Sequence, residues 1–341
     1  MLNGHLGIGV IGCGKIAEVR HLPEYKLNRH AVLVGCCDFI ADRAKNTADK
    51  YGGIAFSSYE ELIACKDIDA VSICSANTTH AEIAIAALRA GKHVLCEKPM
   101  ATTIEDCERM LSEAKKAGKH LMIAHNQRLW ESHQKAKELI KSGVIGKPIT
   151  FKTCFGHRGP DFWSVDKGTG NWFFDKSKSA FGVTADLGIH KIDLIRFLLG
   201  EEITEVMAMA GTLDKKDADG KPVSVEDNTI LLCRMESGIF GTISASWTCY
   251  GDEENGTVIY GSEGSLHISD ADAPIKVIRF GKEPEIFDVP KQTVSGVINA
   301  FVDTVITDNV CPISAESVIP SMKVMFAALE SAKIEKSVHL D

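Results

Sequence analysis

One residue suited to chemistry is Lys98, which lies just beyond the end of a short apolar strand. The segment His93–Met100 reads HVLCEKPM, in which a charged pair and a proline follow the predicted strand. Pro99 has no N–H with which to continue a strand ladder, and it favours an extended backbone at Lys98. Ligands of open parallel sheets bind beyond the carboxyl ends of the strands, so a lysine held there can supply a charge or a proton. The alternative is an ordinary Lys-Pro turn at the surface.

A carboxylate and an imidazole form a second candidate group, on a helix predicted over residues 184–199. Asp186 and His190 are four residues apart and therefore share one face of that helix. Asp193, three residues further, lies on nearly the same stripe and is placed to orient the imidazole. A solvated polar face is the alternative. A metal pair is a further alternative, but no third ligand is evident, so no metal is predicted.

Residues 12–17, GCGKIA, match the dinucleotide-binding pattern G-x-G-x-x-A between a predicted strand and a helix. Gly12 permits the tight turn, and Gly14 lets the backbone approach a pyrophosphate at the helix N-terminus. The small Ala17 allows the helix to pack closely on the strand. The predicted cofactor-binding residues of this loop are Gly12, Gly14, Lys15 and Ile16. A glycine-rich turn without a ligand is the alternative.

An acidic residue ends the second predicted strand, 31–37, roughly 20 residues past this loop, where an acid binds ribose hydroxyls. This residue, Asp38, favours NAD because the 2′-phosphate of NADP would meet a like charge. Arg43 would partly offset that repulsion, so NADP remains the alternative cofactor.

Polar residues follow a further predicted strand, 70–74, and are expected to line the same cofactor cleft. They are Ser75, Asn77 and His80. The alternative is a helix-capping loop, in which Thr78 or Thr79 caps the helix predicted over 81–90.

The order of the predicted elements indicates two domains. Through residues 1–125 short apolar strands alternate with helices, which predicts an α/β Rossmann domain with a doubly wound parallel sheet. Residues 126–341 carry successive strands joined by hairpin turns, which predicts an α+β domain with an open, mainly antiparallel sheet. Helices over 294–307 and 318–333 close this second domain.

Two loops stand out in the second domain. The long polar and aromatic stretch 158–180 is predicted to be a binding loop, because loops of this length in compact chains are usually functional. His157 and Trp172 are expected to bind substrate there, although an aromatic residue in such a loop also has simple packing as an alternative. The charged stretch 214–221 is predicted to be an exposed hairpin loop.

Composition excludes several classes of partner. The chain has 341 residues, 45% of them hydrophobic, and a net charge of −8, which argues against nucleic acid or an acidic membrane as a partner. The first apolar run, 6–11, is too short for a signal peptide, so a cytoplasmic protein is expected. Eleven cysteines show no zinc-binding spacing and are expected to be buried thiols in a reducing compartment. Five of them lie in or beside predicted strands of the first domain: Cys13, Cys36, Cys37, Cys74 and Cys96.

These motifs, in this order, resemble the Gfo/Idh/MocA oxidoreductase family. The resemblance rests on the loop 12–17, the run ALRAGKHV at 87–94 with Glu97-Lys98-Pro99, and the segments 186–190 and 192–194, and it covers essentially the whole chain. Members are NAD(P)-dependent dehydrogenases of sugars, inositols and related polyols. The resemblance therefore implies such an enzyme acting on CH–OH groups, and a homodimer or homotetramer formed through the C-terminal sheet.

The resemblance also implies roles for matching positions. Lys98, Asp186 and His190 correspond to the catalytic set of the family. The matching cofactor-side positions are Gly12, Gly14, Asp38, Asn77, His80 and Glu97. The segment 179–184, SAFGVT, is bulkier than the glycine-rich turn that often precedes the family's catalytic aspartate. This departure bears on the substrate pocket more than on the chemistry.

Oxidation of a secondary alcohol needs a hydride acceptor and a base for the hydroxyl proton. Histidine titrates near neutrality, which suits His190 to the role of base. Lys98, as a cation, would stabilise the developing alkoxide. Asp186 would hold a substrate hydroxyl or help to set the balance of charge between His190 and Lys98. Two alternative functions share these features: an NAD-retaining glycoside hydrolase and a catalytically silent NAD-binding regulator.

Overall fold

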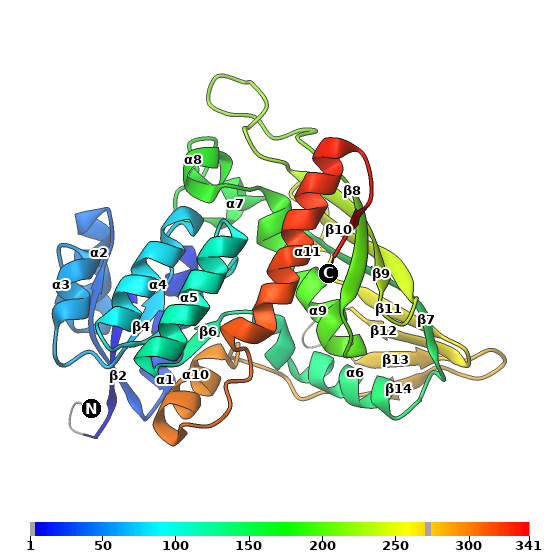
Figure 1. The fold of residues 1–341 in the computed structure, drawn as a ribbon, viewed down its shortest axis with the longest axis horizontal. Coiled ribbons are helices and arrows are strands. Elements are labelled where there is room, and N and C mark those ends of the chain that lie inside the picture. Colours follow the sequence, from blue (N-terminus) through cyan, green and yellow to red (C-terminus); the bar gives the residue numbers. More distant parts are fainter. Residues whose placement is uncertain (1–3, 270–273, 341) are drawn as a thin grey trace. The chain divides into compact units, whose positions relative to one another are not determined.

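The structure, a computed structural model, describes residues 4–269 and 274–340 (Figure 1). It divides into two compact units. Unit 1 comprises Met1–His125 with Val294–Ile319, and unit 2 comprises Asn126–Thr293 with Pro320–Asp341. Each unit is built on its own sheet, so each positions its own set of candidate site residues.

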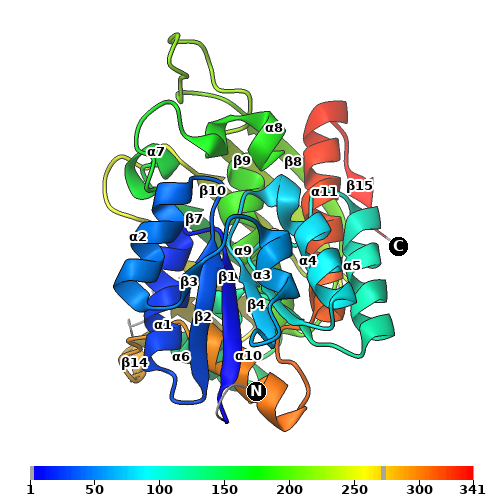
Figure 2. The same ribbon diagram turned by 90° about the vertical axis from the view of Figure 1, so that its left-hand side faces the viewer.

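Unit 1 contains a six-stranded sheet in the order β3-β2-β1-β4-β5-β6, and every pair of neighbours is parallel. Its strands are β1 (Leu6–Ile11), β2 (Ala31–Cys37), β3 (Ile54–Ala55), β4 (Ala70–Ile73), β5 (His93–Cys96) and β6 (Leu121–Ile123). Figure 2 shows β1, β2 and β4 side by side. Strands β1 and β4 are buried along their whole length, as expected for a parallel sheet covered on both faces. The predicted doubly wound sheet is confirmed.

Helices connect these strands in right-handed fashion by default. They are the π-helical turn Ala17–His21, α1 (Leu22–Leu27), α2 (Ala41–Tyr51), α3 (Tyr59–Ala64), the 3₁₀ turn Asn77–Thr79, α4 (His80–Arg89) and α5 (Ile104–Ala117). A further helix of unit 1, α10 (Val297–Thr307), comes from a later part of the chain. The five cysteines named above are buried, as predicted, but the expectation fails for four others, which are only half-buried: Cys65, Cys154, Cys249 and Cys311. Unit 1 also includes a late segment of the chain: Ile123 N donates to Ile313 O at 3.1 Å, and Ser295 N donates to Glu24 at 2.7 Å.

Unit 2 contains a nine-stranded sheet in the order β14-β13-β12-β11-β7-β10-β9-β8-β15. Its strands are β7 (Pro148–Gly156), β8 (Ile203–Gly211), β9 (Asn228–Met235), β10 (Phe240–Ser246), β11 (Thr257–Gly261), β12 (Gly264–Ile268), β13 (Ile275–Ile278), β14 (Glu285–Phe287) and β15 (Val338–His339). Neighbours are antiparallel except β7 and β10, which run parallel. The predicted, mainly antiparallel sheet is confirmed.

One face of this sheet is covered by helices. These are α6 (Glu131–Lys141), α9 (Ile189–Leu199) and α11 (Ala315–Ile334), the last of which begins within unit 1 (Figure 1). Burial alternates along β9, so that Leu231, Cys233 and Met235 enter the core while Ile230 and Leu232 lie on the opposite, exposed face. Such alternation is expected for a sheet that packs helices on one face and leaves the other face exposed.

Three further expectations need correction. The stretch 158–180 is not a continuous loop, because it contains α7 (Pro160–Trp163), the 3₁₀ turn Trp172–Phe174 and α8 (Lys176–Ser179). The helix predicted from residue 184 begins as a π-helical turn, Thr184–Gly188, before α9. The stretch 214–221 is largely exposed, but Lys215 within it is only 4% exposed.

A buried histidine on α6 makes the stability of unit 2 depend on pH. His133 is 1% exposed, and its Nδ1 bonds the carbonyl oxygen of Gln127 at 2.7 Å. Burial, with the charge of Lys191, lowers the pKa of His133 from 6.5 to about 3. Because the unfolded chain binds this proton below pH 6.5 and the folded chain does not, the stabilisation is present above pH 6.5 and is lost as the pH falls towards 3.

We expect the free energy of unfolding to fall between pH 7 and pH 4.5, and His133 to account for about 2–3 kcal/mol of that loss. His133→Gln keeps a side-chain donor for Gln127 but removes the titration, so its stability should depend less steeply on pH. Urea unfolding of both proteins at pH 7.0, 6.0, 5.0 and 4.5 measures the difference. Parallel curves would contradict the assignment.

Candidate functional site

The glycine-rich loop of unit 1 has the shape that a pyrophosphate requires. Gly12 has φ +90°, and a Cβ there would lie 2.6 Å from the carbonyl of Cys74, so both conformation and space require glycine. A Cβ on Gly14 would meet no atom within 4 Å, so the backbone at Gly14 faces open space. Ala17 is fully buried against the sheet. The loop therefore fits the dinucleotide that the pattern predicts.

Asp38 is tied to this loop by its own carboxylate. Its Oδ2 accepts from Cys13 N at 2.7 Å, and its Oδ1 accepts from Ile40 N at 2.8 Å. Arg43 lies 3.9 Å from Oδ1, which brings the predicted pair together. A carboxylate offers about four lone-pair sites, so acceptor capacity remains for ribose hydroxyls.

The segment 75–80 is connected to the turn that carries Lys98. Thr79 does not cap α4 with its side chain; its hydroxyl instead donates to Ala76 O at 2.7 Å and contacts the hydroxyl of Ser75 at 2.7 Å. His80 is buried, and its Nδ1 lies 2.8 Å from Pro99 O. Burial lowers the pKa of His80, and its two ring nitrogens face the carbonyl oxygens of Pro99 and Ser75, so the ring ties residues 75–80 to the Lys98-Pro99 turn. Asn77, also buried, lies on the same segment.

Glu97 is an ionised, buried carboxylate next to Lys98. Burial by itself raises its pKa, but the hydrogen bond from His21 Nε2 at 2.9 Å and the charges of Arg20 and Lys98 outweigh burial and hold the pKa at about 2. Arg20 Nη1 lies 3.5 Å from Oε1, and Lys98 N donates to Oε2 at 3.2 Å. The charge of Glu97 therefore fixes the backbone from which the Lys98 side chain extends.

In unit 2 the carboxylate of Asp186 accepts a hydrogen bond from a buried indole. Trp247 is fully buried, and its Nε1 donates to Asp186 Oδ2 at 3.0 Å. The Trp247 ring packs edge-to-face against Phe173 and Phe174, at centroid distances of 6.4 and 5.9 Å. Sequence reasoning missed Trp247. The available signal was its position at the carboxyl end of the strand predicted over residues 238–247.

His190 and His157 both pack on Phe155. The centroid of Phe155 lies 5.8 Å from that of His190 and 6.0 Å from that of His157. His190 is only 7% exposed. The Nδ1 of His157 accepts from Gly159 N at 2.9 Å, so the hydrogen of a neutral His157 ring is on Nε2. His157 is thereby oriented as a donor.

Trp172 joins the same group through its neighbour. It is half-buried and stacks on Phe173 with a centroid distance of 3.9 Å, and Phe173 contacts Trp247. Of the predicted residues, unit 2 therefore brings together His157, Trp172, Asp186 and His190, through the rings of Phe155, Phe173 and Trp247. Unit 1 carries the remaining predicted residues: Gly12, Gly14, Lys15, Ile16, Asp38, Arg43, Ser75, Asn77, His80, Glu97 and Lys98.

The turn before Asp186 contains one indispensable glycine. A Cβ on Gly182 would lie 1.9 Å from Glu226 O, so no side chain fits there. The carboxylate of Glu226 accepts from Gly182 N at 3.0 Å and from Thr184 N at 3.2 Å. Phe181, one of the bulky residues of this turn, packs edge-to-face on Phe326. Although the segment 179–184 is bulky, these contacts with Glu226 fix the start of the π-helical turn that carries Asp186.

Asp193 has well-defined neighbours of its own. Arg128 binds both its carboxylate oxygens, at 2.7 and 2.5 Å, and Ser321 Oγ donates to Oδ1 at 2.8 Å. These contacts anchor α9 in the core of unit 2. A role for Asp193 in orienting His190 stays a prediction.

The chain was compared with known protein families. The sequence profile of an oxidoreductase family with an NAD-binding Rossmann fold matches residues 6–125, and that of the GFO/IDH/MocA C-terminal domain matches residues 133–267. The chain belongs to the Gfo/Idh/MocA oxidoreductase family. As a member it is an NAD-dependent oxidoreductase, and the expected class of dehydrogenases and reductases acting on CH–OH groups is confirmed.

Individual family members give the same result. Myo-inositol 2-dehydrogenase of Thermotoga maritima is 32% identical over 260 residues, which is 76% of this chain and 74% of that protein. The 1,5-anhydro-D-fructose reductase of Ensifer adhaerens is 33% identical over 259 residues, again 76% and 74%. The solved structure of levoglucosan dehydrogenase with NADH and levoglucosan superposes with a TM-score of 0.86 at 25% identity, over 98% of this chain and 99% of that one.

The described residues carry neither a membrane-spanning helix nor a cluster of metal ligands. In the described ranges, no helix has the length and apolar character needed to cross a membrane. Within residues 4–269 and 274–340, no three His, Cys, Asp or Glu side chains are grouped so as to hold a metal ion.

The two glycines of the cofactor loop should respond differently to the same substitution. Gly14→Ala should fold normally, since nothing lies near the new methyl group, but should weaken NADH binding about tenfold or more by blocking the approach of a pyrophosphate. Gly12→Ala should lower the melting temperature, because its Cβ would clash with Cys74. NADH fluorescence titration and thermal unfolding measure both effects. Wild-type affinity in folded Gly14→Ala would refute the assignment of this loop.

Proposed function

We propose that the protein transfers a hydride between NAD and a secondary hydroxyl of a sugar, inositol or related polyol. The observation that carries the proposal is the grouping in unit 2 of Asp186, His190 and His157 around the buried ring of Trp247 and the half-buried ring of Phe155. Hydroxyl-rich rings are recognised by such a combination of polar groups and aromatic faces. The relatives support this substrate class, since they are named for myo-inositol, 1,5-anhydro-D-fructose and levoglucosan.

His190 is the proposed general base. It takes the hydroxyl proton of the substrate, and a base in this role contributes about 10²–10⁴-fold to the rate. The His190 ring packs on Phe155 and is largely shielded from solvent, so bulk water does not compete for the proton. Asp186, oriented by the Trp247 indole, holds a substrate hydroxyl, and His157 donates from Nε2 to a further substrate oxygen.

Lys98 is the proposed stabiliser of the alkoxide. Its ammonium donates to the reacting oxygen as negative charge develops there. Glu97 and His80 hold the turn that presents it, through Lys98 N and Pro99 O. This division of roles leaves proton transfer to His190 and charge stabilisation to Lys98.

The cofactor is proposed to be held by residues of unit 1. They are Gly12, Gly14, Lys15, Ile16, Asp38, Arg43, Ser75, Asn77, His80, Glu97 and Lys98. When bound, NAD supplies the hydride acceptor. Asp38 favours NAD over NADP, because its carboxylate would repel a 2′-phosphate and Arg43, at 3.9 Å, offsets that charge only in part.

The exposed face of the unit 2 sheet is the proposed subunit interface. On this face Met207 pairs with Leu232, and Met209 pairs with Ile230, across β8 and β9. All four are exposed, and further exposed apolar residues extend the face across the sheet: Phe240, Tyr260, Ile278 and Ile286. Exposed apolar residues that gather on one face of a sheet are typical of a protein–protein interface. We propose a homodimer or homotetramer built on it.

The residue roles can be tested by two substitutions. His190→Ala should lower kcat by about 10²–10⁴-fold while leaving NADH affinity unchanged, because the base acts on substrate alone. Lys98→Met should lower kcat by about 10²-fold or more, since it removes the charge opposite the alkoxide. Initial rates are followed by NADH fluorescence, with NAD and NADP, across inositols, aldoses and their glycosides. Full turnover by His190→Ala at all pH values would refute the base assignment.

The same panel separates the alternative functions. Steady growth of NADH with a polyol supports the dehydrogenase. Release of free sugar from a glycoside without net NADH would instead identify an NAD-retaining glycoside hydrolase. Cofactor binding with neither outcome would favour a silent regulator.

The proposed interface predicts a change of mass in solution. Leu232→Glu places a charge in the middle of the apolar face and should shift the protein towards monomer. Ala218→Glu, in the exposed hairpin loop, adds the same charge elsewhere and serves as the matched control. Size-exclusion chromatography with light scattering measures both. Unchanged mass in Leu232→Glu would place the interface elsewhere.

A further inference from the structure

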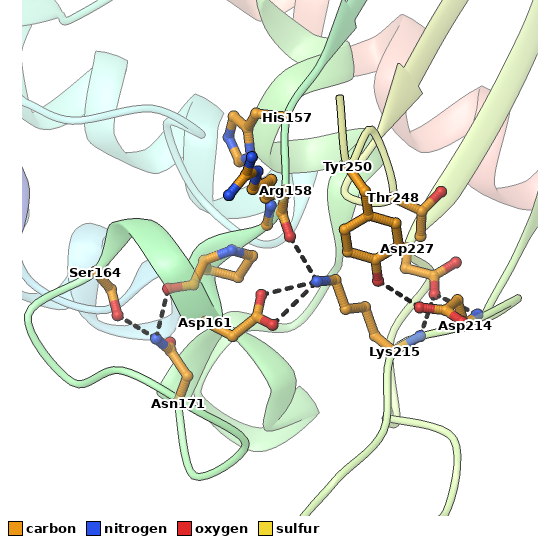
Figure 3. A network of polar contacts seen from close by, with 12 residues as sticks. His157, Arg158, Asp161, Ser164, Asn171, Asp214, Lys215, Asp227, Thr248 and Tyr250 are labelled. Atoms are coloured by element: carbon orange, nitrogen blue, oxygen red, sulfur yellow. Dashed lines mark hydrogen bonds and ion pairs between the residues drawn. The ribbon is translucent and has the colours of Figure 1, made fainter. Parts of the chain in front are cut away.

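A buried lysine in unit 2 lies outside every role assigned so far. Lys215 is 4% exposed, although its loop is otherwise charged and mostly exposed. Figure 3 shows its ammonium among groups from two other segments of the chain. A buried ammonium is costly unless its donors are paired, so its partners indicate what it holds.

The Lys215 ammonium is fully paired. Its Nζ lies 3.0 Å from both carboxylate oxygens of Asp161 and 2.5 Å from the carbonyl oxygen of Arg158. These three oxygens match the three donors of an ammonium. The rings of Phe162 and Tyr250 lie 5.2 and 5.0 Å from Nζ and add cation–π contacts. We call Lys215, Asp161 and the Arg158 carbonyl the Lys215 clamp.

The backbone of Lys215 is itself fixed by a second carboxylate. Asp227 accepts the backbone N–H groups of Leu213, Asp214 and Lys215, at 2.8, 2.8 and 2.7 Å (Figure 3). The Tyr250 hydroxyl donates to Asp214. Lys215 therefore extends from a rigid turn, and the clamp transmits that rigidity to the segment containing Arg158 and Asp161.

The clamp lies against Gly159, two residues after the predicted substrate ligand His157. Gly159, with φ +99°, lies so close that a Cβ there would be 3.0 Å from Lys215 Nζ. The N–H of Gly159 donates to His157 Nδ1, which sets the orientation and tautomer of the His157 ring. Figure 3 shows the side chains of His157 and Arg158 on the side of the backbone away from Lys215. The clamp thus binds the backbone of this segment and makes no contact with the side chains of His157 and Arg158 that Figure 3 draws.

The far end of the same segment is closed by Asn171. Its Nδ2 lies 3.1 Å from Pro160 O and 2.7 Å from Asp166 O, and it also contacts Ser164 Oγ (Figure 3), so its two hydrogens are shared among these three oxygens. Its Oδ1 accepts from Phe173 N at 3.0 Å, which fixes the turn carrying Trp172. Residues 158–173 are therefore tied at one end by Lys215 and at the other by Asn171.

We propose that Lys215 is a positioning residue for substrate binding, which acts by holding His157 in place and, through the contact of Pro160 with Asn171, Trp172 as well. This inference rests on the proposed function, because it takes those two residues to contact the polyol. Lys215 does not touch the reacting atoms. Its loss should therefore weaken substrate binding and leave the chemical step largely intact.

Lys215→Met keeps the length and apolar stem of the side chain but removes its three donors. We expect KM for the polyol to rise about 10- to 100-fold, kcat to change less than about threefold, and the Kd of NADH to stay the same. Lys216→Met, at the exposed neighbouring position, is the matched control and should match the wild type. A wild-type KM in Lys215→Met would overturn the proposal.

A second variant separates positioning from mere stability. Lys215→Met leaves Asp161 without its cation, so its melting temperature should fall. Lys215→Met/Asp161→Asn removes the unpaired charge, and we expect the melting temperature to recover while KM stays raised. If KM recovered together with the melting temperature, the role of Lys215 would be structural only, and the proposal would be wrong.

The clamp can also be tested without any substrate. Amide hydrogen exchange of residues 159–171 should be at least about tenfold faster in Lys215→Met than in Lys216→Met. Equal exchange in the two variants would overturn the proposal whatever the enzyme acts on. A wild-type protein that turned over no polyol would contradict the proposed function, and the exchange result would still decide whether the clamp holds the segment.

Discussion

The parallel pairing of β7 with β10 is the constraint on which the candidate site of unit 2 depends. Gly156 pairs with Ser246 at the carboxyl ends of both strands, so the residues that follow each strand leave the sheet at one edge. His157 follows one strand and Trp247 the other. Trp247 then binds Asp186, and Phe155, at the end of β7, packs on His190. In an otherwise antiparallel sheet, this one pairing brings together residues that are far apart in the sequence.

Three buried charged groups in the two units each form an ion pair inside the protein. Glu97 is paired with Arg20 and hydrogen-bonded to His21, Asp193 is paired with Arg128, and Lys215 is paired with Asp161. Each of these pairs ties a loop or a helix to a neighbouring element. Since breaking such a pair leaves a buried charge, the segments they tie resist displacement. These pairs therefore hold the backbone beside three proposed site residues: Lys98, His190 and His157.

The sequence predicted unit 1 well because its signals are local. Apolar runs, glycines and capping residues occur within each βα repeat, and the strands from β1 to β6 follow in regular alternation with helices. The pairing of β7 with β10 joins residues about 90 positions apart, and no local pattern reports it. The burial of Lys215 depends on Asp161 in a distant segment, and β15 has only two residues. Likewise, nothing in residues 294–319 signals that they pack with unit 1.

The chain passes between the two units three times, after His125, after Thr293 and within α11 after Ile319. A chimera that exchanged only the first 125 residues with a relative would leave the donor β6 facing a foreign segment 294–319. The backbone contact of Ile123 with Ile313 and the contact of Glu24 with Ser295 would both join sequences that had not evolved together. Exchange of cofactor-binding halves within this family therefore requires two fragments to be transplanted together, with the second junction inside a continuous helix.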